Sequence, residues 1–143
     1  MTTALLHKDN SPARVPRGRL RALAVAEASL GALAVWVVAV PVGGVDLLVR
    51  STGGPATAVG VGAVVGVSLL AGLLGWALLA MLERRIARAR TVWTGSALVV
   101  LLLSLAGPLT AGTTAQAKAV LALMHLTIAA VLIPALRRTS PTN

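Results

Sequence analysis

Four long apolar stretches dominate the pattern of hydrophobic and polar positions along the chain. They cover approximately residues 20–40, 56–82, 92–110 and 114–136, and polar or basic residues bound each of them. A helix needs about 20 apolar residues to cross the hydrocarbon core of a bilayer. Inside that core, only a helix or a closed barrel satisfies every backbone polar group. The pattern therefore predicts four transmembrane helices.

Short connections between these stretches predict how the helices pack. Glycine and proline mark the turns at 43–55 and 107–113, and charged residues mark the turn at 83–91. Apolar helices joined by short connections form antiparallel bundles. We therefore expect an all-α, integral membrane, antiparallel four-helix bundle over residues 20–138. The tails are residues 1–19, a basic segment expected to be disordered, and residues 139–143.

The first connection contains a charged pair. In VDLLVR (45–50), Asp46 and Arg50 lie four residues apart. This spacing favours a short interfacial turn of helix with an ion pair between the two side chains.

Basic residues lie at alternate ends of the apolar stretches. The chain has 13 Lys and Arg against 4 Asp and Glu, a net charge of +9. Most basic residues fall in the N-terminal tail, at 83–91 and directly after the fourth stretch, whereas the opposite side carries Arg50 and Lys118. Because cytoplasmic loops are enriched in Lys and Arg, both termini are predicted to be cytoplasmic.

The same charge pattern predicts the partners. Basic residues at helix ends favour the lipid bilayer and its anionic headgroups. Nucleic acid is not expected, because the chain has no Phe or Tyr on which bases could stack. The charge pattern does not decide whether copies of the chain form a homo-oligomer.

Composition excludes several kinds of chemistry. The chain has no cysteine, so disulfides and thiolate-bound metals or clusters are excluded within one chain. Walker, GxSxG and HExxH motifs are absent. We therefore expect no enzyme, no cofactor and no metal. A bias toward Ala, Val, Gly, Leu and Arg favours a bacterial protein, which places the four spans in the plasma membrane.

Three ionisable residues inside the apolar stretches are candidate site residues. Charged groups in hydrocarbon usually face a bundle interior or a wet cavity. Glu27 shares a helical face with small residues, which predicts that it points into the bundle. His125 lies near the middle of the fourth stretch, and Lys118, seven residues earlier, shares its face. The small residues beside Glu27 are Ala24, Gly31 and Ala34.

Two interpretations of these residues stay open. Glu27 and His125 could form a proton-linked or cation-linked path, or they could form an interhelical hydrogen bond that joins the first and fourth spans. Lys118 is expected to form an ordinary ion pair with Asp46 at the outer interface.

The second span is rich in glycine. Gly72 and Gly75 fall on one small face of this helix, and Gly62 and Gly66 form a GxxxG spacing on another. Small faces let helix backbones approach closely in lipid. We expect both faces to pack within the bundle, with a homodimer seam as the alternative.

From about Leu20 to Arg138, the chain resembles an uncharacterised actinobacterial family of small four-span integral membrane proteins. The resemblance rests on VDLLVR (45–50), LLAGLLGWALLAMLERR (69–85), LSLAGPLTAGTTAQAK (103–118) and LALMHLTIAAVLIPALRR (121–138). It implies a membrane location and four helices, and it brings no activity, substrate or catalytic residue.

A weaker likeness connects the chain to small multidrug-resistance transporters. They also have four spans and a glutamate in the first, which AVAEAS (24–29) resembles. The chain departs from them in its fixed basic-residue bias and in lacking an aromatic-rich cavity. We therefore expect a structural or regulatory inner-membrane protein. The alternative is a small oligomeric proton- or cation-coupled transporter that uses Glu27 and His125.

Overall fold

A computed structural model of the chain describes residues 16–50 and 53–140. Four helices dominate this part: α1 (Arg17–Val37), α2 (Val61–Arg85), α3 (Ala89–Ala111) and α4 (Ala115–Thr139). Each is long and apolar enough to cross a membrane, which confirms the prediction of four such helices. Most of the predicted N-terminal tail, and residues 141–143, lie outside the described residues.

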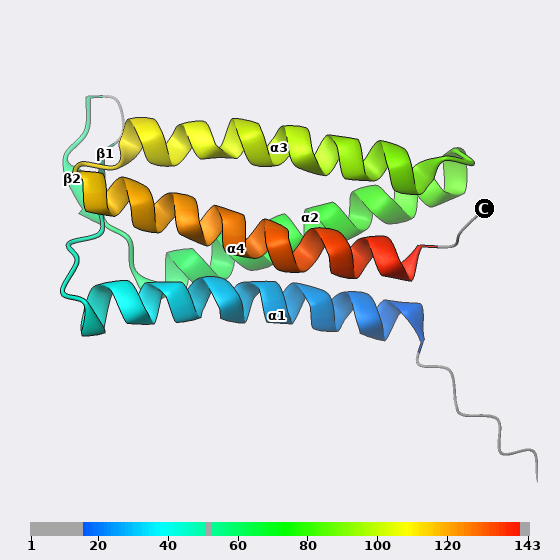
Figure 1. Cartoon of the computed structure of the whole chain (residues 1–143), viewed down its shortest axis with the longest axis horizontal. Helices are drawn as coiled ribbons and strands as arrows, with labels where there is room; N and C mark the ends of the chain where they lie inside the picture. The colour runs from blue at the N-terminus through cyan, green and yellow to red at the C-terminus, as the bar shows by residue number, and fades with distance from the viewer. Residues whose placement is uncertain (1–15, 51–52, 141–143) are drawn as a thin grey trace, which may run out of the picture.

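The four helices pack lengthwise around a common core. α1 packs against α2 and α4, and α3 packs against the same two helices. In Figure 1, α1, α4 and α3 lie one above another, and α2 crosses behind them. The start of α1, the α2–α3 connection and the end of α4 share one end of the bundle. The other two connections share the opposite end, which we call the hairpin end.

A single π-helical turn, η1 (Val38–Val42), extends α1 and contains Pro41. Proline lacks an N–H group, and its ring clashes with the preceding turn of a regular helix. The backbone widens here, so that the Gly43 N–H donates to the carbonyl of Val38 at 2.9 Å. A Cβ on Gly43 would lie 2.8 Å from the Ala39 oxygen, and this close approach requires glycine.

The connection between α1 and α2 is a short hairpin and not the predicted turn of helix. β1 (Leu48–Arg50) pairs antiparallel with β2 (Ala56–Ala58), and α2 therefore begins at Val61, five residues later than predicted. The Leu48 carbonyl also accepts hydrogen bonds from the backbone N–H and the hydroxyl of Thr113, both at 3.2 Å. An extended strand can bond on both edges, and a helical turn cannot.

The hairpin is fixed to the helices. The Trp36 indole donates from α1 to the Val59 carbonyl at 2.8 Å, and Leu47 is buried. The hairpin thus closes one end of the bundle and contacts both α1 and the α3–α4 connection.

Small residues on α1 bring its neighbours close. Ala24, Ala28 and Ala32 are buried and line two core clusters. By contrast, large apolar side chains cover the outside of the bundle; Leu103 on α3 is 70% exposed. A soluble protein rarely exposes a continuous apolar surface of this kind, whereas a bilayer solvates it.

Candidate functional site

Glu27 lies on the outer face of α1, so the prediction that it points into the bundle is wrong. It is exposed, and Leu23 and Leu30 on the same face are 49% and 63% exposed. Ala24 and Ala28 occupy the interior positions instead. Among residues 16–50 and 53–140, no hydrogen bond or ion pair involves the Glu27 carboxylate.

His125 is half-buried on α4 and bonds within its own helix. Its Nδ1 lies 2.8 Å from the Leu121 carbonyl oxygen. Because a carbonyl only accepts, Nδ1 carries the proton, and in the neutral ring Nε2 is the free acceptor. The described residues contain no hydrogen bond between His125 and Glu27. Within one copy, the two predicted site residues are therefore not brought together.

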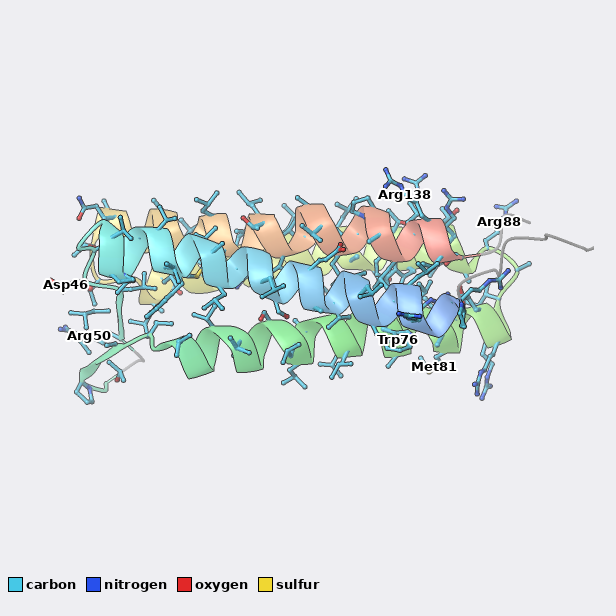
Figure 2. All side chains as sticks on the ribbon, turned by 90° about the horizontal axis from the view of Figure 1, so that it is seen from below. Asp46, Arg50, Trp76, Met81, Arg88 and Arg138 are labelled. Carbon is cyan, nitrogen blue, oxygen red and sulfur yellow. The ribbon has the colours of Figure 1, made fainter. Side chains whose placement is uncertain are left out.

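Lys118 is half-buried near the start of α4 and packs beside a glycine. A Cβ on Gly112 would lie 2.7 Å from Lys118 Cγ. The predicted ion pairs of Asp46 with Lys118 and with Arg50 are not formed, since the one ion pair within the described ranges joins two other residues. Asp46 is exposed at the hairpin end, where Figure 2 also places Arg50.

The ion pair that does form is part of a polar network at the end of the bundle opposite the hairpin end. We call this end the basic end. Arg21 Nη2 lies 2.7 Å from Glu83 Oε1. Arg21 Nε donates to Thr139 Oγ1 at 2.9 Å, and Ser140 Oγ donates to the same Glu83 oxygen at 2.9 Å. The network joins α1, α2 and the end of α4.

This network was not predicted from the sequence, although one feature of the sequence points to it. A carboxylate is unfavourable in the last turn of a helix, where the macrodipole is negative. Glu83 occupies that position in α2, which indicates a cationic partner.

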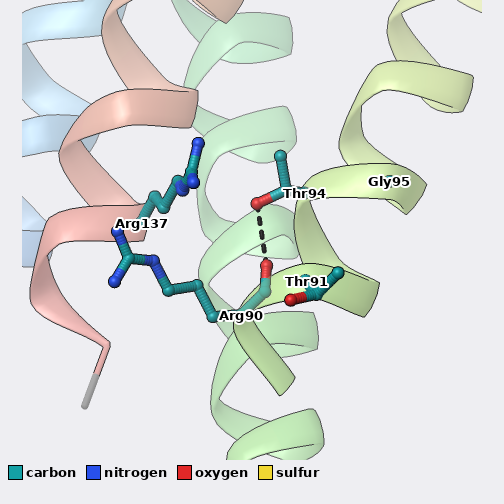
Figure 3. Close-up of a pocket in the computed structure, with 5 residues that line it drawn as sticks. All are labelled: Arg90, Thr91, Thr94, Gly95 and Arg137. Carbon is teal, nitrogen blue, oxygen red and sulfur yellow. Dashed lines mark hydrogen bonds between the residues drawn. The ribbon is translucent and has the colours of Figure 1, made fainter. Parts of the chain in front are cut away.

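A pocket of about 540 Å³ lies between α3 and α4. Arg90, Thr91, Thr94 and Gly95 of α3 line it together with Arg137 of α4. Figure 3 shows the Arg90 side chain reaching from α3 toward the helix that carries Arg137. The Nε of Arg90 is buried and has no hydrogen-bond partner within residues 16–50 and 53–140. No sequence pattern predicts that these two arginines share a pocket, because they are far apart in the chain.

The four glycines of α2 divide into two pairs. Gly72 is buried, and a Cβ there would lie 2.7 Å from Val25 Cγ1. A Cβ on Gly75 would contact Leu132 at 3.6 Å. Gly62 and Gly66 are exposed, and a Cβ added at either would meet no atom of a neighbouring described element within 4 Å, so the expectation that they pack within the bundle is wrong. A homodimer seam at that face stays a prediction.

Comparison with known proteins identifies a family without an assigned role. No curated protein and no solved structure matches the chain. Residues 12–142, nearly the whole chain, match the Family of unknown function (DUF6069). The chain therefore belongs to the Family of unknown function (DUF6069).

Proposed function

We propose that this protein is a structural or regulatory protein of the bacterial plasma membrane that self-associates through the outer face of α1. Its four helices cross the bilayer as an antiparallel bundle with both termini in the cytoplasm. The observation that carries the proposal is the exposed position of Glu27, deep within α1 and with no hydrogen-bond or ion-pair partner among the described residues.

The distribution of charge supports the orientation. In Figure 2, Arg88 and Arg138 lie at the end opposite Asp46 and Arg50. The positive-inside rule assigns the arginine-rich end to the cytoplasm. The described basic residues at that end are Arg17, Arg19, Arg21, Arg84, Arg85, Arg88, Arg90, Arg137 and Arg138.

The depth of Glu27 makes its exposure costly. It lies ten residues after Arg17 and six after Arg21, or about 15 Å and 9 Å along the helix axis. This depth is within the hydrocarbon, and the neighbouring Leu23 and Leu30 side chains suit lipid. A carboxylate in hydrocarbon costs about 2.5–3.5 kcal/mol on insertion scales. Glu27 therefore needs a partner that residues 16–50 and 53–140 of one copy do not supply.

A second copy supplies that partner. Most homodimers have a two-fold axis, which brings the same surface of both subunits together. The two Glu27 carboxyl groups then lie against each other. When both are neutral, each O–H donates a hydrogen bond to the carbonyl oxygen of the other, and the leucines around them exclude lipid.

The test is self-association in proteoliposomes, measured by energy transfer between labelled copies. Glu27→Leu removes the polar pair and should weaken the dimer about threefold to thirtyfold, because interhelical hydrogen bonds in lipid contribute about 0.6–2 kcal/mol. Leu30→Ala should weaken it as well, whereas Leu103→Ala, at an exposed position on the outside of α3, is the matched control. Unchanged or stronger association of the Glu27→Leu protein would contradict the proposal.

A second candidate function uses the same carboxyl group. A proton or cation shared at the centre of an oligomer is exchangeable, which favours a small coupled transporter built around Glu27. His125 would act separately, since no hydrogen bond joins the two residues within the described part of one copy. Glu27→Gln distinguishes the two functions. A carrier should lose proton flux into dye-loaded vesicles while its dimer survives, and a structural protein should change in neither measurement.

A further inference from the structure

The pocket between α3 and α4 concentrates positive charge with no acidic partner in the described part of the chain. Arg90 and Arg137 both line it, and neither forms an ion pair with another described residue. The described acidic residues are Glu27, Asp46 and Glu83, and Glu83 already binds Arg21 and Ser140. Two guanidinium groups that share a pocket repel each other unless an anion lies between them.

The donors in the pocket suit a phosphate group. A guanidinium presents its N–H groups in a planar fork that matches phosphate oxygens. The buried Arg90 Nε has no acceptor among the described residues, and a buried donor without an acceptor is costly in a folded protein. The Thr94 hydroxyl already donates to the Arg90 carbonyl at 2.7 Å, so the Thr91 hydroxyl is the further donor.

The N-terminal end of α3 adds to the positive electrostatic potential of the pocket. No side chain caps this helix, and its first turn has no acidic residue, so the positive end of its dipole is uncompensated. Gly95 keeps the space open, because a Cβ there would meet no atom within 4 Å.

We infer that this pocket binds the phosphate group of an anionic glycerophospholipid. A lipid is favoured over a soluble phosphate by the surface that continues from the pocket along α3. Leu98, Leu102 and Leu109 follow Thr91 and Gly95 at helical spacing on one side of the helix, and all three are exposed. The phosphate lies at headgroup depth beside the arginines, and an acyl chain lies along these leucines.

This inference does not depend on self-association through α1, since the pocket involves α3 and α4. It predicts one saturable site in which a single lipid contacts both helices. This site is additional to the diffuse attraction of anionic lipids to the basic end. Binding would make the stability of the bundle depend on the anionic lipid content of the membrane.

The experiment is a titration of the full-length protein in neutral detergent with phosphatidylglycerol, read by native mass spectrometry. One tightly bound lipid is expected. Arg137→Gln should weaken its binding about tenfold, the effect of losing a charged hydrogen bond. Arg138→Gln removes the same charge from the adjacent exposed position and should change binding less than twofold. Arg90→Gln and Arg88→Gln form a second matched pair.

Gly95→Leu tests the pocket itself, because it fills the space and keeps every charge. It should abolish the tight lipid while circular dichroism shows unchanged helix content. Equal losses for Arg137→Gln and Arg138→Gln, or intact binding to the Gly95→Leu protein, would overturn the site. Competition by inorganic phosphate or glycerol 3-phosphate at the concentration of the lipid would instead identify a soluble phosphate and overturn the assignment to a lipid.

Discussion

Replacing Glu83 by alanine is the sharpest test of how the basic end of the bundle is held together. Arg21 comes from α1, Glu83 from α2 and Thr139 from α4, and their side chains meet in one network. The Arg21 side chain is only 7% exposed, and the Glu83 side chain is 19% exposed. Removing Glu83 leaves Arg21 with one neutral partner, the Thr139 hydroxyl, and leaves Ser140 without its acceptor.

The expected cost follows from this burial. Removing one partner of a buried ion pair costs about 3–5 kcal/mol, since a charge is left buried and uncompensated. Because Glu83 is partly exposed near the headgroups, water can reach Arg21 in the variant, and we expect the low end of that range, about 3 kcal/mol. The double variant Arg21→Met, Glu83→Leu replaces both charges by apolar groups and should recover most of the loss.

The assay is reversible unfolding in mixed micelles, followed by helical circular dichroism as the fraction of denaturing detergent rises. Arg84→Ala, on the adjacent exposed position of α2, is the matched control and should be nearly silent. A loss below about 0.5 kcal/mol for Glu83→Ala, typical of a surface pair, would refute the reasoning. The reasoning would also be refuted if the double variant Arg21→Met, Glu83→Leu were less stable than the Glu83→Ala protein.

Two further predictions concern packing and orientation. Gly72→Leu should destabilise the bundle by about 1–3 kcal/mol through overpacking against Val25, whereas Gly66→Leu should leave the thermal melt of the monomer unchanged; equal melts for the two variants would contradict the packing. In intact cells, an impermeant maleimide should label Thr57→Cys but should label Ala87→Cys only after permeabilisation, and the reverse pattern would contradict the cytoplasmic orientation of the termini.

The sequence predicted the helices well because apolar length alone decides which segments can span a bilayer. It did not predict the hairpin. The two strands have three residues each, and they depend on hydrogen bonds to Thr113, which is distant in the chain. Local spacing of Asp46 and Arg50 could not reveal that partner.

The sequence also did not predict which face of each helix points into the bundle. A helical wheel places Glu27 beside small residues, but those residues divide between interior and exterior, with Ala24 buried and Ala34 exposed. The glycines of α2 divide in the same way. Which small face meets a neighbour depends on where that neighbour lies, and apolar patterning carries little information on this when the solvent is also apolar.

The central claim is that a second copy covers the Glu27 face of α1, and cysteine cross-linking in native membranes tests it most directly. The chain has no cysteine of its own, so single cysteines can be placed without further changes. In a two-fold interface, a residue near the axis meets its own counterpart. Leu30→Cys, one turn after Glu27, should therefore give a covalent dimer with a short bis-maleimide. Leu70→Cys, on the exposed Gly66 face of α2, should stay monomeric. Cross-linking of Leu70→Cys with none at Leu30→Cys would contradict the account and place the contact on α2.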